Sequence, residues 1–233
     1  MRCIATRSAS SSSRSIDPGR GGTCPPRGRP HLPRMLPVTS ALIAANVAIF
    51  LLQGLLPELV IPFALWPWGA SQVDPQVGFA PWQLVSYAFL HGSLLHLAFN
   101  MFALYMFGGA IERVFGGRRY LVYYFMSVIA AAVTQLLVAA LTGGVYPTVG
   151  ASGGVFGLLL AYGIYFPKSR VMLLFPPIPM PARLFVVIYA VIELYLGVTG
   201  TQEGVAHFAH LGGMLGGYLT LRYWRGSTRR LRD

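Results

Sequence analysis

Long runs of apolar residues, separated by short polar stretches, make up most of the chain after residue 36. Six of these runs are predicted to be helices, at about 38–56, 81–111, 120–141, 152–166, 182–198 and 206–224. A helix of ~20 apolar residues is long enough to cross the ~30 Å hydrocarbon core of a bilayer. We therefore predict an all-α integral membrane protein, with one six-transmembrane-helix bundle over residues 36–224.

Composition supports a membrane protein over a water-soluble one. Of the 233 residues, 55% are hydrophobic and only 11% are charged, whereas soluble domains carry about 25% charged residues. The two cysteines, Cys3 and Cys24, lie outside the apolar runs. They favour neither a disulfide framework nor a metal site.

The basic residues are distributed unevenly between the two sides that six spans would create. All 18 Lys and Arg residues fall in 112–119, 167–183 and the two tails, and none falls in 57–80, 142–151 or 199–205. Basic loops stay on the cytoplasmic side. Both termini are therefore predicted to be cytoplasmic, and the net charge of +11 needs no nucleic-acid partner.

The segments outside the predicted helices, namely the two tails and the first loop, differ in composition from the apolar runs. Residues 1–35 form a leader rich in Arg and Ser, which we predict to be disordered. It is either an organellar transit peptide or a mis-assigned start before Met35. We accordingly predict a prokaryotic inner membrane, or an organellar membrane if the leader is a transit peptide. Residues 225–233 are predicted to be a basic tail. The Trp-rich loop 57–80 is expected to lie at the membrane interface, unless 59–66 forms a buried short helix.

Four polar residues from three predicted helices fall at a similar depth. At ~1.5 Å per helical residue, Ser152 and His96 lie roughly 25 Å, and Asn100 and His210 roughly 20 Å, from basic residues at the cytoplasmic ends. Polar groups inside a bilayer are costly and often functional. Packing is the alternative explanation, since Ser152 stands among glycines and a neighbouring carbonyl would satisfy His210.

The fourth apolar run is too short to cross the membrane alone. Residues 146–150 are therefore expected to enter the membrane as irregular backbone, which is tolerated where protein buries it or where it lines a wet cavity. Ser152 then begins a helix, where free N–H groups favour a developing negative charge. We predict a nucleophile, Ser152, and a base, His210. His96 and Asn100 share one helical face and can donate to an oxyanion, whereas His91 is expected to point elsewhere.

A metal site is a further alternative, because His207 and His210 are spaced i,i+3. No HExxH motif is present, and Glu193 is the only acidic residue within an apolar run. We therefore predict no metal and no cofactor. Glu193 is expected to bond to a neighbour or to extend toward the interface, and His207 to line the outer part of a cavity.

Three separated motifs give the chain a specific resemblance. His91-x4-His96-x3-Asn100, then Gly150-Ala151-Ser152-Gly153, and finally Ala209-His210-Leu211-Gly212-Gly213 with Gly217 resemble the rhomboid intramembrane serine proteases over about residues 36–224. This implies that Ser152 and His210 form a dyad without a carboxylate. It also implies an oxyanion site made by the Ser152 N–H and the side chains of His96 and Asn100.

The resemblance also sets expectations for the surroundings of the dyad. Phe156 stands where the family often has Tyr, and its ring is expected to stack on His210. Gly150 and Gly153 frame the serine, and Gly213 and Gly217 are expected to meet Gly154 and Gly157 where two helices approach closely. The implied substrates are transmembrane segments of other proteins in the lipid bilayer. An inactive relative that binds such clients, or a small transporter, is the alternative.

Overall fold

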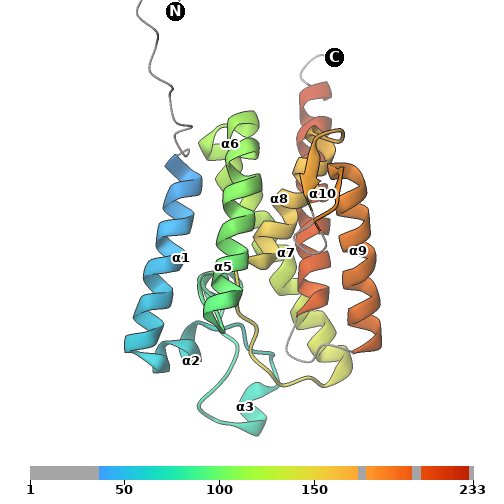
Figure 1. The fold of residues 1–233 in the computed structure, drawn as a ribbon. Helices are drawn as coiled ribbons and strands as arrows, with labels where there is room; N and C mark the ends of the chain where they lie inside the picture. The colour runs from blue at the N-terminus through green and yellow to red at the C-terminus, as the bar shows by residue number, and fades with distance from the viewer. Residues whose placement is uncertain (1–36, 173–176, 201–205, 231–233) are drawn as a thin grey trace, which may run out of the picture. The chain divides into compact units, whose positions relative to one another are not determined.

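The computed structural model describes residues 37–172, 177–200 and 206–230, with side chains up to Arg225. Its long helices run side by side (Figure 1). They are α1 (Pro37–Leu55), α7 (Gly117–Thr142), α8 (Ser152–Tyr165), α9 (Ala182–Thr199), α10 (His207–Arg230) and a continuous helix made of α5 (Leu94–Ala103), a π-helical turn η3 (Leu104–Gly108) and α6 (Gly109–Phe115). The predicted leader, residues 1–35, lies outside the described residues.

The helical class predicted from the apolar runs is confirmed. The first, third, fourth and fifth runs match α1, α7, α8 and α9 to within three residues at each end. In the part of the chain that the structure describes, four helices are long and apolar enough to span a membrane: Pro37–Leu55, Leu94–Phe115, Gly117–Thr142 and Ala182–Thr199. Among the described residues, α8 is apolar but shorter, and α10 continues to Arg230, past the predicted end at 224. A count of six spans stays a prediction.

The second apolar run is not one helix from Pro81, as predicted. Short turns α4 (Gln83–Ser86) and η2 (Tyr87–Phe89) come first, and the chain is then extended at Leu90 and Ser93. The Ser93 hydroxyl accepts a bond from the His96 N–H at 3.1 Å and caps the start of α5. A serine cap stabilises a new helix start. The long helix therefore begins only at Leu94.

The first loop contains short helices rather than one buried helix. They are η1 (Pro57–Leu59), α2 (Val60–Phe63) and α3 (Ala70–Val73), and no residue of η1 or α2 is buried. The all-α prediction also missed an antiparallel ribbon between α8 and α9. Its strands are β1 (Arg170–Met172) and β2 (Pro179–Pro181).

The segment before α8 is irregular, as predicted, and other parts of the chain hold it in place. Thr148 pairs with Leu65 through backbone bonds of 2.9 and 3.0 Å, and the Gly150 N–H donates to the Tyr87 carbonyl at 2.9 Å. Thr148 and Gly150 are buried. Burial with satisfied backbone groups is the condition under which non-helical chain is tolerated at membrane depth. The first residue of α8 is thereby fixed against the first loop and η2.

Glycines bring the backbone of α10 against that of α8. A Cβ at Gly213 would overlap the carbonyl group of Gly153, whose Cα would lie only 3.0 Å away, and a Cβ at Gly157 would lie 3.2 Å from the Gly213 carbonyl oxygen. Small residues permit such close packing of membrane helices. The expected partners were partly wrong, because Gly154 faces Tyr124 and Gly217 faces Tyr123, both on α7.

A buried carboxylate fastens the start of α1 to the bundle. Glu112 on α6 is 4% exposed. Its two oxygens accept bonds from the Val38 N–H at 3.1 Å, the Thr39 N–H at 2.8 Å and the Thr39 hydroxyl at 2.7 Å. The first N–H groups of a helix lack intrahelical partners, so an anionic acceptor there is stabilising. Glu112 thus serves as a long-range cap for α1.

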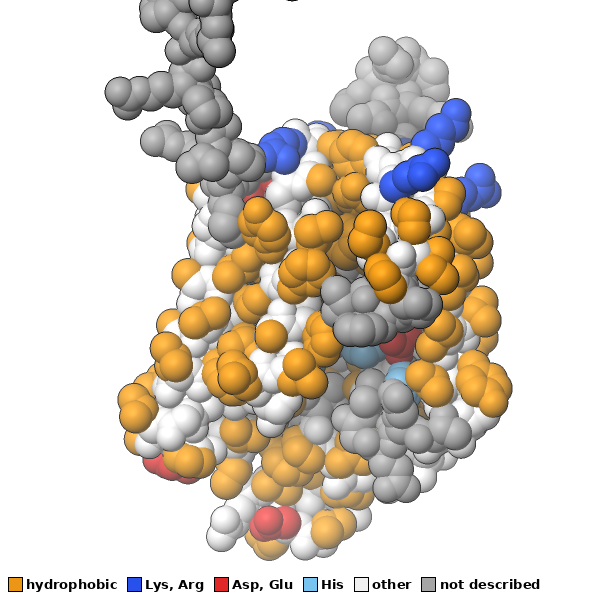
Figure 2. Space-filling view, viewed as in Figure 1, with side chains coloured by type: hydrophobic (Ala, Val, Ile, Leu, Met, Phe, Trp, Pro, Cys, Tyr) orange, Lys and Arg blue, Asp and Glu red, His pale blue; other side chains and the backbone are white. Residues whose placement is uncertain are grey.

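The basic side chains gather at one end of the bundle. Arg113 lies near the end of α6, Arg119 and Arg183 lie near the starts of α7 and α9, and Lys168 follows the end of α8, all at the end of the bundle where α1 begins (Figure 1). On the face shown in Figure 2, Lys and Arg side chains appear only at this end, whereas acidic side chains appear at both ends and at the centre. This agrees with the predicted segregation of basic loops.

Replacement of Gly213 by alanine should destabilise the bundle. The added methyl group would overlap the Gly153 backbone, and overpacking costs about 1–3 kcal/mol. The control is Gly109→Ala, because a Cβ at Gly109 would meet none of the described atoms within 4 Å. That variant should keep or slightly raise stability. Thermal unfolding in detergent micelles measures both, and an unchanged midpoint for Gly213→Ala would contradict the packing described here.

Candidate active site

The structure brings the predicted nucleophile and base into contact. Ser152 is the first residue of α8, and His210 lies in the first turn of α10. The distance between Oγ of Ser152 and Nε2 of His210 is 2.8 Å. Both residues are partly buried. A hydroxyl bonded to an imidazole nitrogen at this distance is arranged to lose its proton to that ring.

The His210 imidazole is contacted on its ring face as well as at its edge. The rings of Phe156 and His210 are stacked, with centroids 4.3 Å apart and planes 5° from parallel. Phe156 is four residues after Ser152 and so lies on the same side of α8. The expected stack on the base is therefore present. It restricts rotation of the His210 ring about its χ angles.

The start of α8 leaves backbone donors beside the serine. The first bond along the helix runs from the Val155 N–H to the Ala151 carbonyl, at 3.1 Å. The N–H groups of Ser152, Gly153 and Gly154 precede it and have no carbonyl partner within the helix. They lie at the positive end of the helix dipole. This geometry suits an oxyanion formed next to Ser152.

Gly150 makes room for His96 next to the serine. A Cβ at Gly150 would lie 2.8 Å from both Cε1 and Nε2 of His96, and 3.7 Å from Oγ of Ser152. The backbone of Gly150 has φ of +125°, a conformation that residues with a side chain rarely adopt. The structure therefore places the His96 ring beside Gly150 and near Ser152. Gly153 lies elsewhere: its Cα faces Ala131 of α7, and its carbonyl faces Gly213 of α10.

Asn100 and His91 lie on either side of His96 along the chain. Asn100 is buried, and its Nδ2 donates to the His96 carbonyl at 3.0 Å, which uses one of its two N–H groups. His91 is also buried. The expectation that His91 points elsewhere is wrong, because its ring lies edge-on to that of His96 with centroids 5.1 Å apart. Helical spacing does not relate these two residues, since α5 begins after His91.

A carboxylate contacts the base, contrary to the expected dyad without one. Oε2 of Glu193 on α9 lies 2.9 Å from Nδ1 of His210 and 2.7 Å from Nδ1 of His207. The sequence predicted that Glu193 bonds to a neighbour, and this is confirmed. It did not identify the neighbour as the base. An acidic residue within an apolar run was the available signal, and Figure 2 shows acidic and His side chains together at mid-height of the bundle.

The same three residues have the composition of a metal site. One ligand atom each from Glu193, His207 and His210 lie within 4.8 Å of one another. The argument that no carboxylate is suitably placed is therefore wrong. The observed separations of 2.7 and 2.9 Å are nevertheless hydrogen-bond lengths, and Nε2 of His210 is already bonded to Ser152. The contacts present are those of a base held by a carboxylate.

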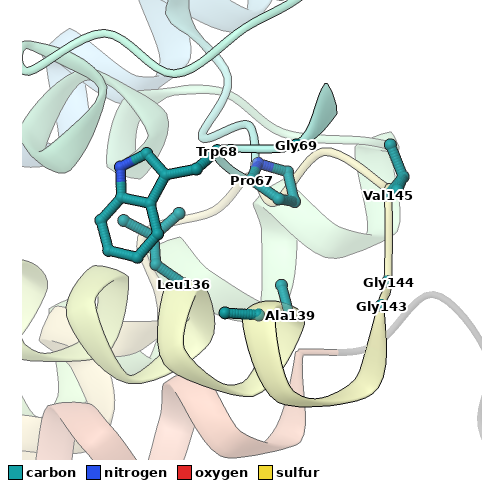
Figure 3. A pocket seen from close by; sticks show the side chains of 9 residues that line it. Pro67, Trp68, Gly69, Leu136, Ala139, Gly143, Gly144 and Val145 are labelled. Carbon is teal, nitrogen blue, oxygen red and sulfur yellow. The ribbon is translucent and has the colours of Figure 1, made fainter. Parts of the chain in front are cut away.

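A separate hollow of about 180 Å³ lies between the first loop and the end of α7. Figure 3 shows Trp68 and Pro67 on one side and Leu136 and Ala139 on the other. None of the predicted site residues lines it. Its walls are mainly apolar and contain no titratable side chain, so it lacks the groups that the chemistry of Ser152 requires.

Comparison with known proteins identifies the family. The Rhomboid domain model matches residues 79–226, which include Ser152, His210, His96 and Asn100. The chain belongs to the rhomboid family. The resemblance carried by the three motifs is thereby confirmed.

Named rhomboid proteases of bacteria are among the relatives. The chain is 33% identical to rhomboid protease GluP of Bacillus subtilis over 59% of this chain and 25% of that protein. It is 30% identical to rhomboid protease GlpG of Klebsiella pneumoniae over 73% of this chain and 61% of that protein. It is 27% identical to the putative rhomboid protease YdcA of Bacillus subtilis over 80% of this chain and 87% of that protein. The chain thus spans less than two thirds of the first two relatives.

The contact between Ser152 and His210 predicts selective chemical reactivity. A fluorophosphonate probe should label Ser152, because the imidazole takes up the hydroxyl proton as the oxygen attacks phosphorus. Peptide mapping by mass spectrometry should locate the adduct, and Ser152→Ala should abolish it. Ser86→Ala is the matched control, since the Ser86 hydroxyl donates to the Phe63 carbonyl and should not be needed for labelling. Labelling that survives in Ser152→Ala would contradict the assignment.

Proposed function

We propose that the protein is an intramembrane serine endopeptidase that cleaves transmembrane segments of other membrane proteins, with Ser152 as nucleophile and His210 as general base. The observation that carries this proposal is the 2.8 Å contact between Oγ of Ser152 and Nε2 of His210. The relatives named as rhomboid proteases support it. Membership in the family and four apolar helices of spanning length make the protein a multi-pass integral membrane protein.

The proposed reaction is acyl transfer through the serine. The Ser152 proton moves to Nε2 of His210 while the oxygen bonds to the carbonyl carbon of the substrate, and the carbonyl π pair moves to its oxygen. The N–H of Ser152 and the side chains of His96 and Asn100 stabilise this oxyanion. His210 then gives the proton to the leaving amine. Water, activated by His210, attacks the acyl-enzyme and releases the second product.

The proposed substrates must reach the site within the bilayer. A transmembrane helix hides its carbonyls in hydrogen bonds, so the cleaved segment has to unwind locally first. Segments that contain helix-breaking residues should therefore be preferred. We place their lateral access beside α9. The bacterial relatives and the basic end of the bundle support a prokaryotic inner membrane with cytoplasmic termini.

Neither an inactive client-binding relative nor a small transporter is favoured by a specific observation. Inactive members of the wider superfamily characteristically lack the serine or the histidine, whereas this chain has both in contact. A small transporter would use paired discontinuous helices from an internal repeat. The relatives are named proteases rather than transporters.

Removal of either member of the pair should abolish cleavage. Reconstituted protein with a transmembrane reporter is the assay, and Ser152→Ala and His210→Ala should each lower turnover by about 10⁴-fold or more, to below detectable cleavage, since the hydroxyl or its base is lost. Ser152→Ala should unfold near the wild-type temperature, whereas His210→Ala removes a donor from buried Glu193 and the ring that stacks on Phe156, so activity is compared per folded molecule. Full activity in either variant would exclude the proposed pair.

Asn100→Ala tests the oxyanion assignment. Loss of one donor to the oxyanion should lower kcat by about 10–10³-fold. The matched control is Asn46→Ala, because Asn46 is also buried and donates from Nδ2 to the carbonyl four residues earlier, at 2.8 Å, but lies on α1. Activity per folded molecule should stay unchanged in that control. A wild-type rate in Asn100→Ala would remove Asn100 from the oxyanion site.

A further inference from the structure

One buried carboxylate joins the two histidines of α10. Glu193 is 8% exposed, and the same oxygen, Oε2, contacts Nδ1 of His207 and Nδ1 of His210. Burial of an ionised carboxylate is unfavourable unless hydrogen-bond donors compensate it. Two imidazole N–H groups supply that compensation. The contact therefore stabilises the carboxylate and constrains both rings.

The contact selects one tautomer of His210. An ionised carboxylate can only accept hydrogen bonds, so the proton of neutral His210 must be on Nδ1. Nε2 then carries its lone pair, and this is the nitrogen that lies 2.8 Å from Oγ of Ser152. The other tautomer would direct a lone pair at the carboxylate and an N–H at the serine. Only the first tautomer can accept the serine proton.

The packing of α9 against α10 builds this arrangement. Glu193 and Gly197 are four residues apart and share one face of α9. A Cβ at Gly197 would lie 3.1 Å from the Phe208 ring and 3.3 Å from Cβ of His207. The absence of a side chain at Gly197 thus allows the start of α10 to lie close to α9. One turn earlier on α9, the Glu193 carboxylate then reaches both histidines.

We propose that Glu193 is a positioning residue for this reaction, which holds His210 in the Nδ1–H tautomer and stabilises the imidazolium formed when the ring accepts the Ser152 proton. This inference rests on the proposed function. The proton that leaves Oγ goes to Nε2, the proton on Nδ1 stays there, and Glu193 remains ionised throughout. His207 donates its own Nδ1–H to the same oxygen and fixes the direction of the carboxylate.

A metal ion at these three residues is incompatible with this role. A metal bound through Nδ1 of neutral His210 would need the lone pair of that nitrogen, so the single ring proton would have to move from Nδ1 to Nε2, and no lone pair would then face Ser152. Carboxylate positioning and metal binding therefore make opposite predictions for activity. Within the described residues, the titratable groups around the His210 ring are Glu193 from α9, His207 from α10 and His96 from α5, and the ring also contacts Ser152 of α8.

Glu193→Gln tests the proposal, because it keeps the shape of the side chain and removes its charge. We expect kcat to fall by about 10–10³-fold, within the range of a weakened general base, while KM changes by less than about threefold. The rate of Ser152 labelling by a fluorophosphonate should fall by a similar factor, since it needs the same base. Glu193→Asp retains the charge and should recover part of the loss.

Glu112→Gln is the matched control. Glu112 is buried and carries three hydrogen bonds, but these go to the start of α1. This variant should lower the unfolding temperature and leave kcat per folded molecule unchanged. The pair of variants separates the loss of a buried carboxylate in general from the loss of the one that contacts the base.

The outcomes distinguish this inference from the function on which it rests. A wild-type protein that neither cleaves a reporter nor labels at Ser152 would reject the proposed function. If the wild type is active and the kcat of Glu193→Gln lies within about twofold of the wild-type kcat, only the role of Glu193 is rejected. The role is also rejected if Glu193→Gln and Glu193→Asp lose the same share of activity and this loss equals the loss of folded protein. Wild-type activity that is lost to a chelator and restored by Zn²⁺ would assign a metal site and overturn the proposal.

Discussion

The backbone contact between α8 and α10 is the constraint on which the site depends. Ser152 and His210 are 58 residues apart in sequence, and nothing in either helix alone brings them together. Gly153 follows the serine directly, and Gly213 follows the histidine by one turn. Because these two glycines meet backbone to backbone, the side chains of Ser152 and His210 come within hydrogen-bond distance of each other. A residue with a side chain at Gly213 would separate the helices and therefore the pair.

Much of the fold follows from the period and length of apolar runs. Those runs located α1, α7, α8 and α9, because a bilayer-length run of apolar residues with few breakers has few alternatives to a helix. The break before α5 was not predicted, since His91, Gly92 and Ser93 interrupt the apolar run only briefly, and the Ser93 cap that marks the new start is a contact of the folded chain. The β1–β2 ribbon was missed because two short strands leave no periodic signal.

Sequence reasoning located the groups of the site better than their contacts. Depth along each helix placed Ser152, His210, His96 and Asn100 in one layer, but depth says nothing about rotation of a helix about its axis. The rotation of α9 decides whether Glu193 faces the bundle, and it depends on the fit of Gly197 against Phe208. The isolated acidic residue was visible in the sequence. Its partners were not, because His207 and His210 both lie on another helix, α10.

The position of Glu193 links the base to the helix beside which we place substrate access. Four residues of α9 are buried, Ala182, Phe185, Val186 and Glu193, so past its first turns this helix is held inward at Glu193. Its bonds to His207 and His210 are therefore both an attachment for α9 and a restraint on the base. A substrate that displaces this part of α9 would withdraw the carboxylate from His210.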